Sequence, residues 1–88
     1  GNAVLWKPSE LAPGVSRLIY DLLQECGLGQ CVQMVVGGVE QGEAVVEAAC
    51  DKYVLVGGVE TGRRVLSRLG RLLKPAVAEL SGADPMVV

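Results

Sequence analysis

The sequence predicts an α/β fold in which strands and helices alternate around a parallel sheet. Short aliphatic runs alternate along the chain with segments whose apolar residues recur at the helical spacing. Hydrophobic residues make up 50% of the 88 positions and none is Phe, so Val, Leu and Ala must build the core. That composition is typical of strands buried on both faces. Strict alternation indicates right-handed crossovers, with helices on the faces of the sheet.

The first strand is predicted at Ala3–Lys7 and ends at Pro8. Ser9 then supplies a capping side chain, and Glu10 an acid, ahead of the first helix. Gly27 is the expected C-terminal stop of that helix. Apolar residues at the spacing of one helical face predict its buried stripe, which consists of Val15, Leu18, Ile19, Leu22, Leu23 and Cys26.

Two further strands are each followed by a pair of glycines. The second strand is predicted at Cys31–Val36, before Gly37-Gly38, and the third at Tyr53–Val56, before Gly57-Gly58. Between them the spacing predicts a short helix over Gln41–Ala49. Its inward residues are Val45, Val46 and Ala49.

The third helix is predicted to begin near Glu60-Thr61 and to run to Leu73, before Pro75. The fourth strand is Ala76–Leu80, and Ser81-Gly82 form the turn after it. The stripe of this helix that we expect to be buried consists of Val65, Leu66, Leu69, Leu72 and Leu73.

Ligands of parallel sheets bind beyond the carboxyl ends of the strands. In this chain those ends carry the two glycine pairs and two charged side chains, Lys7 and Glu79. The sequence therefore predicts a site along this edge.

Composition argues against several function classes. The net charge is −2, and most arginines fall on the predicted third helix, which indicates a solvated face rather than a nucleic-acid surface. There is no His, and Cys26, Cys31 and Cys50 form no close pair, so no metal site is predicted. No apolar run approaches the about 20 residues of a membrane span. An odd cysteine count without a signal peptide favours a reducing, cytoplasmic compartment. The chain begins and ends in apolar runs, which indicates a piece of a longer protein.

The segment Gly57–Gly62 joins a buried strand to a helix. Its glycines would let the backbone approach a bound group, and the helix N-terminus favours an anion such as a pyrophosphate. A tight strand-to-helix turn explains the same glycines.

Lys7-Pro8-Ser9-Glu10 places an ammonium and a carboxylate on either side of a proline bend. The Lys could donate to a ribose hydroxyl and the Glu could accept from one. A strand-end charge and an acid near a helix N-terminus are the structural alternative.

Glu79 is the only acid in an otherwise apolar strand. Desolvation at a buried strand end would raise its pKa and make it a plausible general base. An inward-leaning acid paired with an arginine is the alternative.

Four segments, in order and nearly in register, resemble motifs of the NAD(P)-dependent aldehyde dehydrogenases. Gly1–Glu10 is similar to G-N-x-x-x-x-K-P-S-E, and Gly27-Leu28 to the turn A-G-(L/F)-P. Gly57–Gly62 resembles the coenzyme loop G-S-T-x-x-G, and Glu79–Gly82 the active-site segment E-L-G-G. The resemblance implies a Rossmann-like parallel sheet, of which residues 1–88 form part of the coenzyme-binding domain.

The resemblance also implies residue roles. Lys7 and Glu10 hold the adenosine ribose, Gly37 lies near the adenine, and Glu79 is the general base. The implied coenzyme-binding positions are Lys7, Pro8, Ser9, Glu10, Gly37, Gly57, Gly58, Val59 and Gly62. NAD is expected in preference to NADP, because the Glu10 carboxylate accepts from a 2′-hydroxyl and repels a 2′-phosphate.

Several positions depart from these motifs. Gly58 stands where the family usually has Ser, so only backbone contact with a phosphate remains there, and Ser81 replaces the Gly after the active-site Glu-Leu. The other departures are Val56, Val59 and Ala83-Asp84. None of the three cysteines matches the family's nucleophile, which lies beyond Val88, so this segment alone lacks it.

The resemblance thus implies a segment of a homo-oligomeric enzyme that oxidises an aldehyde to a carboxylic acid with NAD(P). The segment would supply the adenosine and pyrophosphate cradle and the general base. The departures motivate one alternative, a non-catalytic scaffold domain of the same fold. Another nucleotide-binding α/β protein, using the same edge for a different ligand, is a further alternative.

Overall fold

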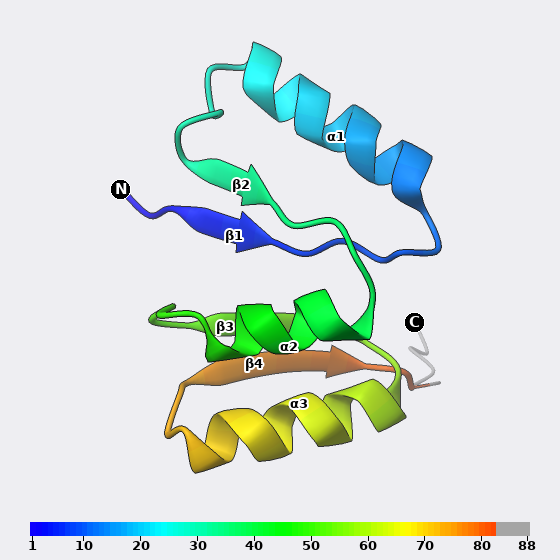
Figure 1. Cartoon of the computed structure of the whole chain (residues 1–88), viewed down its shortest axis with the longest axis vertical. Helices are drawn as coiled ribbons and strands as arrows, with labels where there is room; N and C mark the ends of the chain where they lie inside the picture. Colours follow the sequence, from blue (N-terminus) through cyan, green and yellow to red (C-terminus); the bar gives the residue numbers. More distant parts are fainter. Residues whose placement is uncertain (83–88) are drawn as a thin grey trace, which may run out of the picture. The chain divides into compact units, whose positions relative to one another are not determined.

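The computed structural model describes residues 1–82, so the departures at Ala83-Asp84 lie outside the described residues. The order of elements is the predicted alternation (Figure 1). The elements are β1 (Val4–Trp6), α1 (Pro13–Glu25), β2 (Val32–Met34), α2 (Val39–Glu47), β3 (Tyr53–Gly57), α3 (Val59–Arg71) and β4 (Ala76–Leu80).

The chain divides into two compact units, Gly1–Glu47 and a second that begins at Ala48. In the first, β1 pairs with β2 in parallel, from Val4 opposite Val32 to Trp6 opposite Met34. In the second, β3 pairs with β4 in parallel, from Tyr53 opposite Ala76 to Gly57 opposite Leu80. Parallel pairing is therefore confirmed, and each unit holds its own two-stranded sheet.

Helix α1 begins later than the sequence suggests and ends where predicted. Its N-cap is Ala12, which makes no side-chain cap, and Pro13 occupies the first turn, where its fixed φ is preorganised. The prediction that Ser9 caps the helix was wrong, because Ser9 Oγ instead accepts from Leu11 N at 3.3 Å in the preceding turn. At the other end Gly27 has φ 78°, and its N–H donates to the Gln24 carbonyl at 3.0 Å. This is the left-handed stop that glycine favours.

Most of the predicted buried stripe of α1 is exposed, and Leu23 alone among its six residues is half-buried. Val15, Leu18 and Leu22 are 60%, 61% and 50% exposed. The helix instead buries Ser16, whose Oγ donates to the Ala12 carbonyl at 2.8 Å. The reason is size: strands of three residues extend about 10 Å, whereas a 13-residue helix extends about 20 Å. The prediction of burial was therefore wrong.

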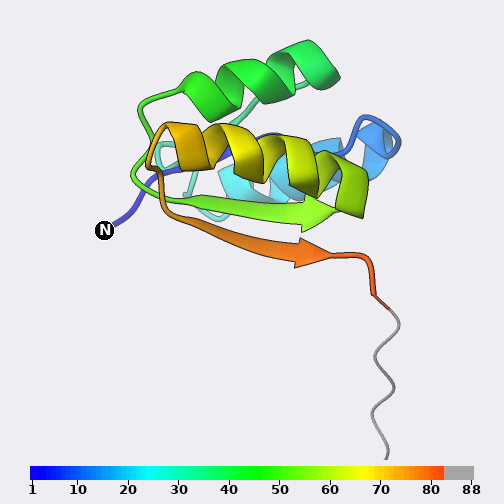
Figure 2. The ribbon, with the colours of Figure 1, turned by 90° about the horizontal axis from the view of Figure 1, so that it is seen from below.

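In the second unit α3 covers one face of the β3–β4 sheet (Figure 2). Leu69 is 1% exposed and Tyr53 8% exposed on that side. Gly62 lets the helix approach closely, since a Cβ there would lie 2.5 Å from Leu80 Cδ2. The opposite face carries Val54, Val56 and Val77, all exposed, so the prediction of strands buried on both faces was wrong here. One helix cannot cover two faces of a sheet.

A polar cluster joins the start of β3 to the end of α3. Tyr53 Oη donates to the Ala48 carbonyl at 2.6 Å, and Lys74 Nζ donates to Tyr53 Oη at 2.8 Å. Lys74 Nζ also lies 5.0 Å from the centre of the Tyr53 ring. These contacts fix the loop in which Pro75 leads into β4.

Leu73, predicted at the end of the buried stripe of α3, is 91% exposed and has φ 54°. It occupies the left-handed position just after the helix: its N–H donates to the Gly70 carbonyl at 3.2 Å, and the Lys74 N–H to the Leu69 carbonyl at 2.9 Å. Glycine is the usual residue at this position, because a Cβ is strained there.

Leu73→Gly is therefore expected to raise the free energy of unfolding by about 0.5–1 kcal/mol. The substitution relieves the left-handed strain and removes a side chain that buries almost nothing. Urea denaturation measures the change. Leu73→Ala is the control, since it retains Cβ and should give no comparable gain. An equal gain for Ala, or a loss for Gly, contradicts the strain argument.

Candidate functional site

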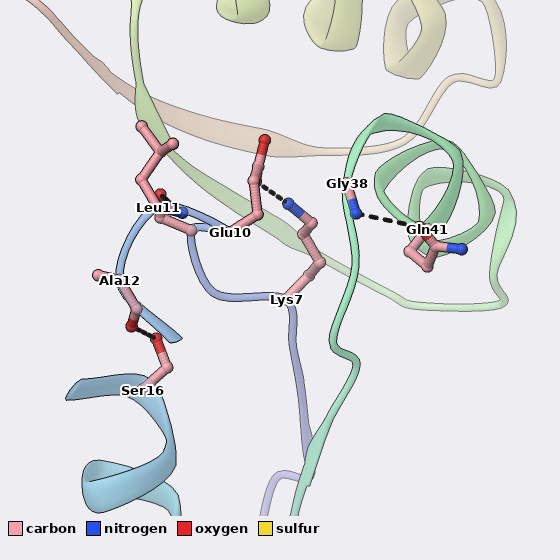
Figure 3. Close-up of polar contacts among 8 residues, drawn as sticks. Lys7, Glu10, Leu11, Ala12, Ser16, Gly38 and Gln41 are labelled. Carbon is pink, nitrogen blue, oxygen red and sulfur yellow. Dashed lines mark hydrogen bonds and ion pairs between the residues drawn. The ribbon is translucent and has the colours of Figure 1, made fainter. Parts of the chain in front are cut away.

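An ion pair follows the carboxyl end of β1. Lys7 Nζ donates to Glu10 Oε2 at 2.8 Å (Figure 3). The Lys7 side chain is 19% exposed and that of Glu10 is 52% exposed. The hydrogen bond from Lys7, with a further one from its own backbone N–H, holds the pKa of the Glu10 carboxyl below its ordinary value. Glu10 is therefore a carboxylate at neutral pH, and the pair is balanced in charge.

A hollow of about 380 Å³ lies beside this pair, within the first unit. Its wall combines the β1–α1 loop, the first turns of α1 and the chain at and after the end of β2. That volume is within the range of small-molecule sites. The lining residues are Pro8, Ser9, Glu10, Pro13, Ser16, Arg17, Met34, Val36, Gly37 and Gly38.

The structure thus brings together the predicted positions of the first unit. Pro8, Ser9, Glu10 and Gly37 line the hollow, and Lys7 is bonded to one of them. Sequence reasoning did not identify Arg17 as a wall residue. The available signal was an arginine beside the apolar stripe of α1, with Asp21 one helical turn later.

The wall after β2 is shaped by glycine backbone. Gly37 has φ 155°, at the edge of the range that side chains avoid, and a Cβ there would collide with the Gln41 side chain. The Gly38 N–H donates to Gln41 Oε1 at 3.0 Å, which closes the turn into α2 (Figure 3). Glycine at position 37 is thus required by the backbone itself.

The glycine loop of the second unit connects β3 to α3. Gly57 ends the strand, Gly58 is the N-cap, and Val59 begins the helix. No side chain caps this N-terminus. Its first-turn N–H groups and the helix dipole together favour an anion. A Cβ at Gly58 would lie 3.9 Å from Ser81 Oγ. Gly58 and Ser81, which both depart from the motifs that the sequence resembles, therefore lie beside each other.

Glu79 lies on β4, directly opposite Val56 in the register, on the sheet face that α3 leaves uncovered. Its side chain is exposed, so the expectation of a buried strand end was wrong for the described residues. The reason is again that α3 covers only the other face. Among residues 1–82 none of the ion pairs involves Glu79, which does not support the alternative of an arginine partner.

The arginines of α3 face outward. Arg63, Arg64, Arg68 and Arg71 are exposed, as expected for a solvated helix face. Within residues 1–82 no helix combines the length and the apolar character that crossing a membrane requires.

Comparison with known proteins gives consistent matches. The family model described as "Aldehyde dehydrogenase family" matches residues 1–88. Over 88 residues the chain is 40% identical to aldehyde dehydrogenase family 3 member H1 of Arabidopsis thaliana. The aligned region covers 100% of this chain and 18% of that protein. It is 42% identical over 89 residues to 4,4'-diapolycopene aldehyde oxidase of Methylomonas sp. That aligned region covers 100% of this chain and 17% of the Methylomonas protein.

A solved structure, described as the substrate-bound state of Staphylococcus aureus AldH, matches with a TM-score of 0.82 and 29% identity. That match covers 93% of this chain and 18% of the other. The chain therefore spans less than a fifth of the length of each of these proteins.

Proposed function

This chain belongs to the aldehyde dehydrogenase family, and from that premise we propose that it forms the adenosine side of the coenzyme site in a longer enzyme. That enzyme oxidises an aldehyde to a carboxylic acid with NAD(P). The hollow beside the Lys7–Glu10 pair is the observation that carries the proposal.

The groups around the hollow fit an adenosine ribose. The Lys7 ammonium uses one N–H on Glu10 and has others to donate, while the Glu10 carboxylate has lone pairs left to accept. A ribose carries two adjacent hydroxyls, each of which both donates and accepts. Because Glu10 stays ionised, it accepts from a hydroxyl throughout the neutral pH range. Met34, Val36 and Gly37 offer an apolar wall for the adenine ring.

The α3 N-terminus fits the pyrophosphate. Gly57, Gly58 and Val59 present backbone rather than side-chain donors, consistent with the uncapped first turn. Gly62 contributes through packing. Because it has no side chain, the first turns of α3 can pack against Leu80, and this packing holds the N–H groups of the helix N-terminus in place.

In the proposed reaction NAD accepts a hydride when bound. A thiolate from outside residues 1–88 adds to the aldehyde carbonyl. Loss of a hydride to the bound coenzyme would convert this adduct into a thioester, which water then hydrolyses. Glu79 takes a proton from the attacking water and passes it to the departing sulfur, so that a carboxylic acid and a free thiol are released. NAD is the proposed coenzyme, in preference to NADP. The three free cysteines are consistent with a reducing, cytoplasmic compartment, and homo-oligomeric assembly stays a prediction.

A scaffold domain of the same fold is the second candidate function. The absence of a side-chain donor at Gly58, and the presence of Ser81 beside it, favour this alternative. Aldehyde-dependent formation of NADH by the full-length protein separates the two, since a scaffold gives none.

Glu10→Gln in the full-length enzyme is expected to raise kcat/KM for NADP relative to NAD by about tenfold. Gln removes the charge that repels a 2′-phosphate and releases Lys7 to pair with it. Steady-state kinetics with both coenzymes measures the ratio. Glu25→Gln, at the end of α1 and outside the hollow wall, is the matched control and should leave the ratio unchanged. A wild type that already prefers NADP, or an unchanged ratio in Glu10→Gln, contradicts the assignment of Glu10.

A further inference from the structure

We propose that Arg17 is a second specificity-determining residue of the adenosine hollow, and that Asp21 restrains it. On this inference, which rests on the proposed function, discrimination against a 2′-phosphate depends on two ion pairs rather than on Glu10 alone.

Arg17 is placed to reach a ligand in the hollow. It lies early in α1 and lines the same wall as Ser9 and Glu10. Its side chain is 70% exposed, so the guanidinium has room to turn. Arginine is also the side chain best suited to a phosphate, because its planar fork matches phosphate oxygens.

Asp21 holds this arginine through one nitrogen. Arg17 Nε donates to Asp21 Oδ1 at 2.9 Å and to Oδ2 at 3.0 Å. In the described part of the chain no other hydrogen bond or ion pair involves Arg17, so its two terminal nitrogens keep their donors. The hydrogen bonds to the Asp21 carboxylate, and its charge, also raise the pKa of Arg17 above its ordinary value, although an arginine is charged at neutral pH in any case.

The charges around the hollow are therefore matched. Lys7 forms an ion pair with Glu10, and Arg17 forms one with Asp21. A neutral ribose hydroxyl needs only hydrogen-bond partners and finds them in such a site. A 2′-phosphate is a dianion and needs an excess of positive charge, which the two carboxylates withhold.

The two ion pairs differ in the exposure of the cation and in whether its carboxylate partner lines the hollow. The Lys7 side chain is 19% exposed and bonded to a wall residue, whereas Arg17 is largely exposed and bonded to a residue outside the wall. Removing the Asp21 charge therefore changes the charge at the hollow without changing the groups that line it. A neutral residue at position 21 removes the carboxylate that competes for Arg17, and because an exposed ion pair is weak the expected gain for a phosphate is modest.

The experiment uses the full-length protein and two small probes, 5′-AMP and adenosine 2′,5′-bisphosphate, titrated by calorimetry. Asp21→Asn is expected to lower the Kd of the bisphosphate about fivefold and to leave the Kd of AMP within about twofold. In the double variant Asp21→Asn/Arg17→Met the gain should disappear. Glu25→Gln, which removes one negative charge from the same helix, should give no selective gain.

Each other outcome counts against the inference. Equal tightening of both probes indicates a general effect of charge, and a gain that persists without Arg17 indicates another cation. If Glu10→Gln changes the coenzyme ratio but Asp21→Asn does not, this inference fails and the proposed function stands. If the wild type binds neither probe nor NAD, the proposed function and this inference fail together.

Discussion

Glu79→Gln in the full-length enzyme is expected to leave thiol acylation and the first hydride transfer intact and to slow deacylation by about 10²–10⁴-fold. Gln keeps the shape of the side chain and loses its basicity, so the strand should pack as before. Glu79 lies opposite Val56 on the sheet face that α3 does not cover, among exposed aliphatic side chains.

Pre-steady-state kinetics measures this effect. The variant should give a burst of NADH followed by a slow steady rate. Glu43→Gln, on α2, removes another exposed carboxylate and should leave the steady rate unchanged. An unchanged steady rate in a well-folded Glu79→Gln enzyme would sink the assignment and favour a structural role. Ser81→Gly tests whether the neighbouring hydroxyl displaces the carboxylate, in which case the deacylation rate changes.

Leu69→Ala is expected to lower the free energy of unfolding by about 2–5 kcal/mol. Leu69 is 1% exposed and is the most deeply buried large side chain among residues 1–82. It holds α3 against the β3–β4 sheet, so its loss removes buried area and leaves a cavity in the small core of the second unit. Urea denaturation measures the change, and Leu73→Ala, at a residue 91% exposed, is the control. A loss below about 1 kcal/mol would contradict the packing described for α3.

The sequence was a good guide to the elements and a poor guide to their burial. Alternating periodicity predicted the order of strands and helices, and Gly27 marked the end of α1 because a left-handed residue there favours glycine. Most of the apolar stripe of α1 and the uncovered face of β3–β4 were predicted to be buried and are exposed. Periodicity identifies which face is apolar, but the elements that cover it depend on tertiary structure.

The residues of the candidate site likewise fall into some that the sequence indicates and some that it does not. The Lys7–Glu10 pair could be anticipated because the two residues are close in sequence and joined by a proline bend. Met34 and Val36 could not, because the hollow collects them from a segment distant in the sequence, and the place of Arg17 beside the apolar stripe of α1 indicated only its side of the helix, not the wall that it joins. The proximity of Gly58 and Ser81 also escaped prediction, since it depends on the register between β3 and β4.

A crystal structure of the full-length protein with NAD bound tests the central claim most directly. The measurement is the distance from the adenosine ribose hydroxyls to Lys7 Nζ and to the Glu10 carboxylate. The account predicts that both lie within hydrogen-bonding distance, about 2.6–3.2 Å, with the adenine in the hollow beside Gly37. An adenosine ribose held by other residues, with the hollow vacant, would contradict it.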